Sequence, residues 1–212
     1  MPVPFDVDPK ALAHQARKPE GDVGRRVGEV MAQRNVEPYA FAFQCLHLQP
    51  TDRVLEIGFG PGEGIAEAVR LAPQGFVAGV DISETMLTMA EERNRRAILE
   101  EQVELRLGDA AAMPFADESF DKVFSVNVFH FWNDPSRELA ECRRVLKPGG
   151  RIVFFLTHPS SWFPGAAESG IFYAREAEEV AAILRDAGFR DVNHQTFPMA
   201  EERKGFAVWG VK

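Results

Sequence analysis

The chain has 212 residues and is 45% hydrophobic, which is enough for one sizeable buried core. Its net charge of −8 argues against the basic surface that nucleic-acid binding requires, and no apolar run is long enough to span a bilayer. The amino terminus has no leader pattern, and the two cysteines, Cys45 and Cys142, stand far apart in segments with helical character. We therefore expect a cytoplasmic protein with no disulfide, no metal site and no nucleic-acid or membrane partner.

The first fifty residues are predicted to be helical, because they contain no strand pattern. Within residues 21–35, apolar side chains recur at the spacing of one helix face, namely Val23, Val27, Val30 and Met31. A second helix is expected to begin near Pro38, since proline is tolerated in the first turn. Its aromatic residues are assigned to the core, and Tyr39, which carries a polar hydroxyl, is the candidate exception. Residues 1–50 are thus predicted to be a helical extension, and residues 51–212 the main part of one structural domain.

From Arg53 onward, strand and helix patterns alternate, which predicts an α/β fold with a doubly wound, mostly parallel sheet. The expected strands are 54–57, 76–80, 103–107, 120–128, 151–156, 189–197 and 206–211. The expected helices are 64–71, one that follows a cap at Ser83, 134–146 and 175–187. The residues KPGG at 147–150 are typical of a turn and are expected to end the third of these helices.

A glycine-rich loop follows the first strand, with Gly58, Gly60 and Gly62 at every second position. In doubly wound sheets such a loop lies beside the ligand, and glycine is needed where the backbone takes a positive φ or approaches the ligand closely. Asp81 ends the second strand 21 residues after Gly60 (81 − 60), where its carboxylate can accept both hydroxyls of a ribose. The loop is therefore predicted to hold a nucleoside.

The G-x-G-x-x-G fingerprint of dinucleotide sites fits this loop in no register, because Glu63, Ile65 or Glu67 stands where its last glycine would be. Glu63 would also repel a pyrophosphate at the start of the following helix. The loop thus favours a ribose-bearing ligand without phosphates, and an NAD-dependent oxidoreductase is the less favoured alternative. A non-catalytic protein that binds the cofactor and regulates a partner stays open as a second alternative.

Further motifs follow in order along the chain: LGDA at 107–110, Asn127 late in the fourth strand, and RVLKPGG at 144–150. With the glycine loop and Asp81, they make the region 53–156 resemble the class I S-adenosylmethionine-dependent methyltransferases that act on small molecules. The resemblance implies a Rossmann-like methyltransferase fold, with a seven-stranded sheet in the order 3-2-1-4-5-7-6 and the seventh strand antiparallel. It also implies S-adenosyl-L-methionine as the cofactor.

The same resemblance implies a set of cofactor-binding residues. They are Glu56, Gly58, Gly60 and Gly62 around the methionine part, Asp81 at the ribose, Ile82, Met86, Asp109 and Ala110 at the adenine, and Asn127, through its backbone carbonyl, at the methionine ammonium. The segment that contains Arg25, Arg26, Met31 and Asn35 resembles the helical lid of small-molecule methyltransferases. The alternative is a helix that packs far from the site.

His130, in the stretch FHFWND after the fourth strand, is the candidate catalytic residue. An unperturbed histidine ionises near neutral pH, so we expect a general base whose loss lowers the rate by about 10²–10⁴-fold. The alternative is a packed or solvated side chain, because proximity alone can carry a methyl transfer. His158 and Trp162 are expected at the opposite lip of the site.

The methyl acceptor is expected to be a small, largely apolar molecule. Only about twenty residues, 157–175, separate the fifth strand from the next helix, which leaves little chain for a large substrate. The aromatic residues Phe129, Phe131, Trp132 and Trp162 supply apolar surface at this place.

Overall fold

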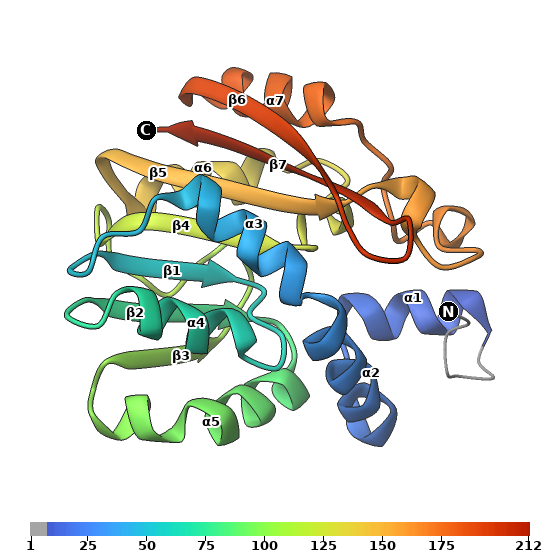
Figure 1. Ribbon diagram of the computed structural model, residues 1–212, viewed down its shortest axis with the longest axis horizontal. Helices are drawn as coiled ribbons and strands as arrows, with labels where there is room; N and C mark the ends of the chain where they lie inside the picture. Colours follow the sequence, from blue (N-terminus) through green and yellow to red (C-terminus); the bar gives the residue numbers. More distant parts are fainter. Residues whose placement is uncertain (1–7) are drawn as a thin grey trace.

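The computed structural model describes residues 8–212, so the part of the predicted helical extension that precedes Asp8 lies outside the described residues. The fold is a seven-stranded sheet in the order β3-β2-β1-β4-β5-β7-β6, shown in Figure 1. Its strands are β1 Arg53–Ile57, β2 Phe76–Asp81, β3 Val103–Leu107, β4 Phe120–Val126, β5 Leu146–Thr157, β6 Arg190–Pro198 and β7 Lys204–Val211. Only β7 runs antiparallel to its neighbours, which confirms the predicted sheet and its strand order.

Helices cover both faces of the sheet (Figure 1). The helices are α1 Pro9–Arg17, α2 Gly21–Arg34, α3 Val36–Leu46, α4 Glu63–Leu71, α5 Glu84–Leu99, α6 Ser136–Val145 and α7 Ala177–Asp186, with short 3-10 turns η1 Phe129–Phe131, η2 Pro159–Ser161 and η3 Ala167–Ser169. One buried core lies between the sheet and α6 with α7, and the other between the sheet and α3, α4 and α5. The alternating pattern therefore gives the doubly wound architecture that it predicts.

The helices at the start of the chain belong to this architecture in two different ways. Helix α3 contributes Ala42, Phe43 and Leu46 to the core on one face of the sheet. Helices α1 and α2 lie beyond the carboxyl ends of the strands (Figure 1), where α2 packs on α5. A side chain at Gly28 would collide with Met86 and Met89, so the glycine allows this close approach of the two helices.

Most strand boundaries lie within two residues of the prediction, and two of the differences have a clear structural cause. Strand β4 ends at Val126 because Asn127 takes a left-handed backbone conformation, with φ of 59°, and the chain then enters η1. The predicted turn at 147–150 is wrong: α6 ends at Val145, and β5 already begins at Leu146, which pairs with Phe120. Gly149, with φ of 78°, lies in the irregular first part of that strand.

Both cysteines are buried as free thiols, Cys45 on α3 and Cys142 on α6. Between residues 8 and 212, no helix has the length and apolar character needed to cross a membrane.

Candidate active site

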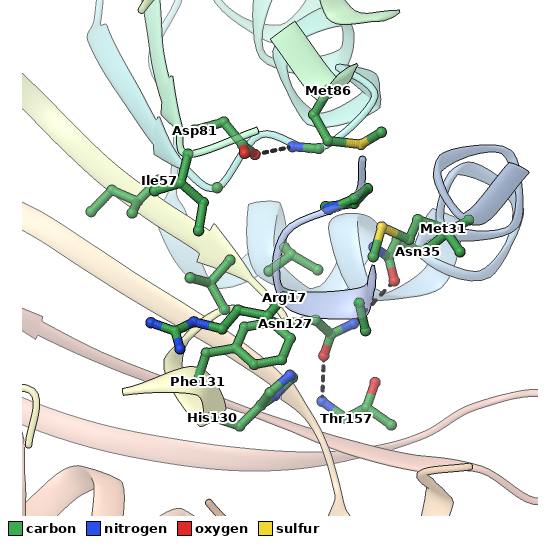
Figure 2. Close-up of a pocket in the computed structure, with 18 of the residues that line it drawn as sticks. Arg17, Met31, Asn35, Ile57, Asp81, Met86, Asn127, His130, Phe131 and Thr157 are labelled. Atoms are coloured by element: carbon green, nitrogen blue, oxygen red, sulfur yellow. Dashed lines mark hydrogen bonds between the residues drawn. The ribbon is translucent and has the colours of Figure 1, made fainter. Parts of the chain in front are cut away.

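A cavity of about 300 Å³ opens at the carboxyl ends of the central strands. The loops after β1, β2 and β4 form one wall, and α1 and α2 form the opposite wall. Figure 2 shows Asp81, Asn127 and His130 facing this space from the sheet side, and Arg17 and Met31 facing it from the helices. Most of the residues predicted to bind a cofactor line it, namely Gly58, Gly60, Asp81, Ile82, Met86, Asp109, Ala110 and Asn127.

The glycines of the loop after β1 serve different purposes. Gly60 has φ of 52°, and a side chain there would point into open space with no atom within 4 Å, so its absence keeps the cavity open. Gly62 does not line the cavity; with φ of 90° it caps α4, and a side chain there would meet Ala90 and Asn94 of α5. The structure therefore assigns Gly60 to the site and Gly62 to the packing behind it.

Asp81 is held at the end of β2 by backbone donors. Its carboxylate accepts hydrogen bonds from the N–H of Gly60 and of Ser83, each at 2.9 Å. Burial raises its pKa from 3.8 to about 6, against the opposing effect of these donors. Ser83 caps α5 and donates its hydroxyl to the carbonyl of Pro19, so the same corner joins the sheet to the α1–α2 connection.

Glu56, a predicted cofactor contact, lies one layer behind the cavity wall. Its side chain is fully buried and accepts a hydrogen bond from the hydroxyl of Tyr39 at 2.9 Å. Burial raises the pKa of Glu56 well above its usual range, and its Oε2 atom has no partner within residues 8–212. Tyr39 itself lines the cavity, so the expected contact of Glu56 with a ligand is not direct in this structure.

One part of the cavity lies at the carboxyl ends of β2 and β3. Met86, only 1% exposed, and Ile82 form its apolar side. Asp109 follows β3 and accepts a hydrogen bond from the N–H of Ala111 at 2.9 Å. Glu138 of α6 also lines this end, and burial raises its pKa, with a smaller contribution from Asp109. No sequence motif marks Glu138, because it comes from a helix that is distant in the chain.

Asn127 connects the sheet to the helical wall. Its side-chain carbonyl accepts a hydrogen bond from the N–H of Thr157 at 2.7 Å, and its side-chain amide donates to Asn35 at 3.0 Å (Figure 2). Asn35 lies where α2 ends and α3 begins. Of the predicted lid residues, Met31 and Asn35 thus reach the cavity, whereas Arg25 pairs with Glu92 of α5 on the exterior.

His130 lies in the cavity wall beyond Asn127, surrounded by aromatic rings. It is 3% exposed and stacks on Phe172 with ring centroids 4.7 Å apart, and Phe131 and Trp162 meet it edge-on. Burial, and to a lesser extent the charge of Arg175, lowers its pKa to about 3. The expectation that His130 ionises near neutral pH is therefore wrong, since its surroundings exclude the water that would stabilise the charged ring.

The opposite lip also differs in part from the prediction. Trp162 lines the cavity, but His158 does not; its ring contacts Ser160 and Glu176 instead. Two cations that the sequence does not single out, Arg17 and Arg34, line the helical wall. Each lies at the carboxyl end of its helix, a place where basic residues are common for reasons unrelated to ligands.

Comparison with known proteins gives a consistent result. The sequence model of the family described as methyltransferase domain matches residues 55–154. The chain is 29% identical over 168 residues to the uncharacterized methyltransferase YdaC of Bacillus subtilis, covering 79% of this chain and 88% of that protein. It is 33% identical over 172 residues to 27-O-demethylrifamycin SV methyltransferase of Amycolatopsis mediterranei, covering 72% of this chain and 61% of that protein. The chain belongs to the class I S-adenosylmethionine-dependent methyltransferases.

Solved structures of methyltransferases share this fold. Phosphoethanolamine N-methyltransferase 2 of Haemonchus contortus, in complex with S-adenosyl-L-methionine, superposes with a TM-score of 0.71 at 20% identity, covering 84% of this chain and 52% of that one. The cofactor of this methyltransferase is S-adenosylmethionine. The residues present fit it, because Asp81 offers a carboxylate for ribose hydroxyls and the missing side chain of Gly60 leaves the space beside it open.

Proposed function

We propose that this methyltransferase transfers the methyl group to a small, largely apolar acceptor, bound between helices α1 and α2 and the segments that follow β4 and β5. The observation that carries the proposal is the division of the cavity into two halves. One half has polar groups at strand ends, Asp81 and Asp109, and the other has aromatic walls, including Phe131, Trp162 and Phe172. Ligand pockets of this kind are mostly apolar, with a few polar groups that set the orientation.

In this proposal the polar half holds the cofactor. Asp81 accepts the ribose hydroxyls, Ile82 and Met86 pack on the adenine, and Asp109 and the N–H of Ala110 bind its polar edge. The Gly58–Gly60 turn and the backbone carbonyl of Asn127 surround the methionine part. Arg34 directly precedes Asn35, which bonds to Asn127, so Arg34 is placed to pair with the methionine carboxylate.

Helices α1 and α2 act as a lid over both halves. Leu12, Val27 and Met31 line the cavity from this side, and they separate the ligands from solvent. A water-excluded site strengthens each polar contact inside it and prevents hydrolysis of the reactive cofactor.

When bound, S-adenosylmethionine would supply a methyl group on a positively charged sulfur. The lone pair of the acceptor would form the new bond to the methyl carbon, and the electron pair of the broken carbon–sulfur bond would stay on sulfur. The task of the chain is to hold the attacking atom in line with that bond, a proximity effect that can supply several powers of ten in rate. If the acceptor carries a proton on the attacking atom, the proton must leave as well. His130 is buried and neutral, which makes it a weak base and a better polar contact.

The sequence and its relatives also indicate which class of molecule accepts the methyl group. The similar methyltransferase of Amycolatopsis mediterranei is named for a small molecule, 27-O-demethylrifamycin SV. The net charge of −8 disfavours nucleic acid as the acceptor, and two buried free thiols fit a reducing, cytoplasmic environment.

The test has two stages. Calorimetric titration should show that S-adenosylhomocysteine binds and that NAD binds far more weakly; comparable NAD binding would contradict the cofactor assignment. Incubation with methyl-labelled S-adenosylmethionine and a panel of small aromatic and aliphatic acceptors should then yield a labelled product. Normal S-adenosylhomocysteine binding with no product from any acceptor would favour the non-catalytic alternative.

A further inference from the structure

Arg17 brings a positive charge to the aromatic half of the cavity. It is the last residue of α1, and its side chain reaches into the cavity (Figure 2). Within residues 8–212 its guanidinium has no hydrogen bond and no ion pair. Arg203, which also lines the cavity, differs in that it pairs with Glu37 at 3.5 Å.

The packing of helix α1 fixes the backbone position of Arg17. Asp8 caps α1 by accepting hydrogen bonds from the N–H groups of Lys10 and Ala11, each at 3.1 Å. Ala13, fully buried, lies in a cluster with Ile171 and Phe172, and Trp162, Phe163 and Ala16 pack against this cluster. Helix α1 therefore presents its apolar face to the aromatic compartment and, at its end, one guanidinium.

A second observation indicates that this compartment takes a ligand with a polar group. The Nδ1 atom of His130 is buried and has no hydrogen-bond partner within residues 8–212. A buried polar atom without a partner is unusual and costs free energy, so such atoms commonly face a ligand or water. The ring belongs to the wall formed with Phe131 and Phe172, and α1 packs on the same wall.

The acidic side chains of the cavity do not neutralise Arg17. Asp81 and Asp109 are bonded to backbone donors in the cofactor half, and Glu63 forms an ion pair with Arg93. Glu138, the fourth acidic residue of the lining, lies at the Asp109 end. In the proposed function, Arg34, which adjoins Asn35 at the α2–α3 junction, is the residue that pairs with the carboxylate of the cofactor. Arg17 is an exposed residue, so its charge stays available to a ligand that lies against the apolar wall.

We propose that the methyl acceptor carries an anionic oxygen group, such as a carboxylate, on an apolar body, and that Arg17 is the residue that selects this group. This inference rests on the proposed function, because it specifies the acceptor of the same site. An apolar body fits against Phe131, Trp162 and Phe172, and the guanidinium offers paired N–H donors that match an anionic oxygen group.

The experiment measures binding without turnover. Protein saturated with S-adenosylhomocysteine is titrated with 2-naphthoate, 2-naphthalenemethanol and 2-naphthylmethylammonium, which share a ring system but differ in charge. Tryptophan fluorescence reports binding, since Trp132 and Trp162 line the cavity. The same titrations use decanoate, decanol and decylammonium, and each is repeated with Arg17→Gln and with the control Lys10→Gln, which removes a charge from α1 outside the cavity.

The anionic member of each series should bind at least about tenfold more tightly than the alcohol, and the ammonium more weakly than both. Arg17→Gln should reduce the anion preference to about threefold or less, whereas Lys10→Gln should retain it, and both should bind S-adenosylhomocysteine as the wild type does. Equal binding of the three charges, an unchanged preference in Arg17→Gln, or no binding of any probe would overturn the inference. So would a loss of S-adenosylhomocysteine binding confined to Arg17→Gln, which would place Arg17 at the cofactor. Failure of the wild type to bind S-adenosylhomocysteine at all would instead contradict the proposed function.

Discussion

Replacement of Asp81 by asparagine separates cofactor recognition from folding. The carboxylate accepts hydrogen bonds from Gly60 and Ser83 with its two oxygens. An asparagine keeps one acceptor and turns a donor towards the other N–H, and one buried donor without a partner costs about 1–3 kcal/mol. The substitution also removes a buried charge. The difference between the pKa values of 3.8 and about 6 corresponds to about 3 kcal/mol that ionisation of Asp81 costs the folded state at neutral pH.

These two effects on the free energy of unfolding oppose each other and nearly cancel, so Asp81→Asn should fold with a stability close to that of the wild type at neutral pH. Cofactor affinity has no such compensation, because the ribose hydroxyls lose a charged acceptor. We expect S-adenosylhomocysteine to bind about 1.5–3 kcal/mol more weakly, or about 10- to 150-fold.

The pH dependence of stability and of cofactor affinity provides an independent test of the role of Asp81. The pKa of folded Asp81 lies above its unfolded value, so its contribution to stability is fully present below about pH 3.8 and is lost as the pH rises through about 6. Binding of ribose hydroxyls favours the ionised carboxylate, so wild-type affinity for S-adenosylhomocysteine should rise as the pH increases through about 6. Asp81→Asn should lack this rise.

The assay combines urea unfolding with calorimetric titration of S-adenosylhomocysteine at acidic and neutral pH. Asp121→Asn is the control, because Asp121 accepts from the N–H of Arg53 and from Lys147 at the opposite end of the sheet. An Asp81→Asn protein that binds S-adenosylhomocysteine within about threefold of the wild type at neutral pH would refute the reasoning, as would a wild-type affinity independent of pH.

Two further predictions concern the other walls of the cavity. If α1 and α2 form a lid, the backbone amides of residues 21–35 should exchange more slowly with deuterium once S-adenosylhomocysteine is added. The amides of α7 serve as the unaffected reference. Unchanged exchange in residues 21–35 would mean that this segment only packs against the protein and does not close over the ligand. Because burial holds the pKa of His130 at about 3, His130→Gln should lower the rate at saturating substrates by less than about tenfold. A wild-type ionisation near neutral pH that disappears in His130→Gln would restore the role of general base.

The cofactor half could be predicted from the sequence because its information is local. Asp81 ends a strand, Gly60 and Asp109 lie within about three residues after one, and the carboxyl ends of parallel strands meet at one edge of the sheet. The strand order was available from the family resemblance, which the motifs carried. Spacing could not separate Gly60 from Gly62, because both have positive φ and only the surrounding packing decides which one faces the ligand.

The acceptor half could not be predicted in the same way, because it is assembled from distant segments. Ala13 of α1, Phe131 after β4 and Phe172 before α7 meet in one compartment. The ionisation of His130 follows from that assembly, since the rings that exclude water from it are far away in the chain. The prediction of a turn at 147–150 was wrong for a related reason. Pairing of Leu146 with Phe120 extends β5 across residues that favour a turn on their own.

The two halves meet at Asn127, and its conformation explains how they are joined. A regular strand residue would continue the pairing of β4, but the φ of 59° ends the strand, and asparagine tolerates this conformation better than most residues. Both polar atoms of its side chain are used within the protein, the carbonyl by Thr157 and the amide by Asn35. That leaves the backbone carbonyl as the group that can accept from the cofactor. Because Asn35 is also the junction of α2 and α3, the position of the lid and the position of the cofactor's methionine end depend on the same residue. We infer that the hydrogen bond between Asn35 and Asn127 couples the position of the lid to the binding of the cofactor's methionine end.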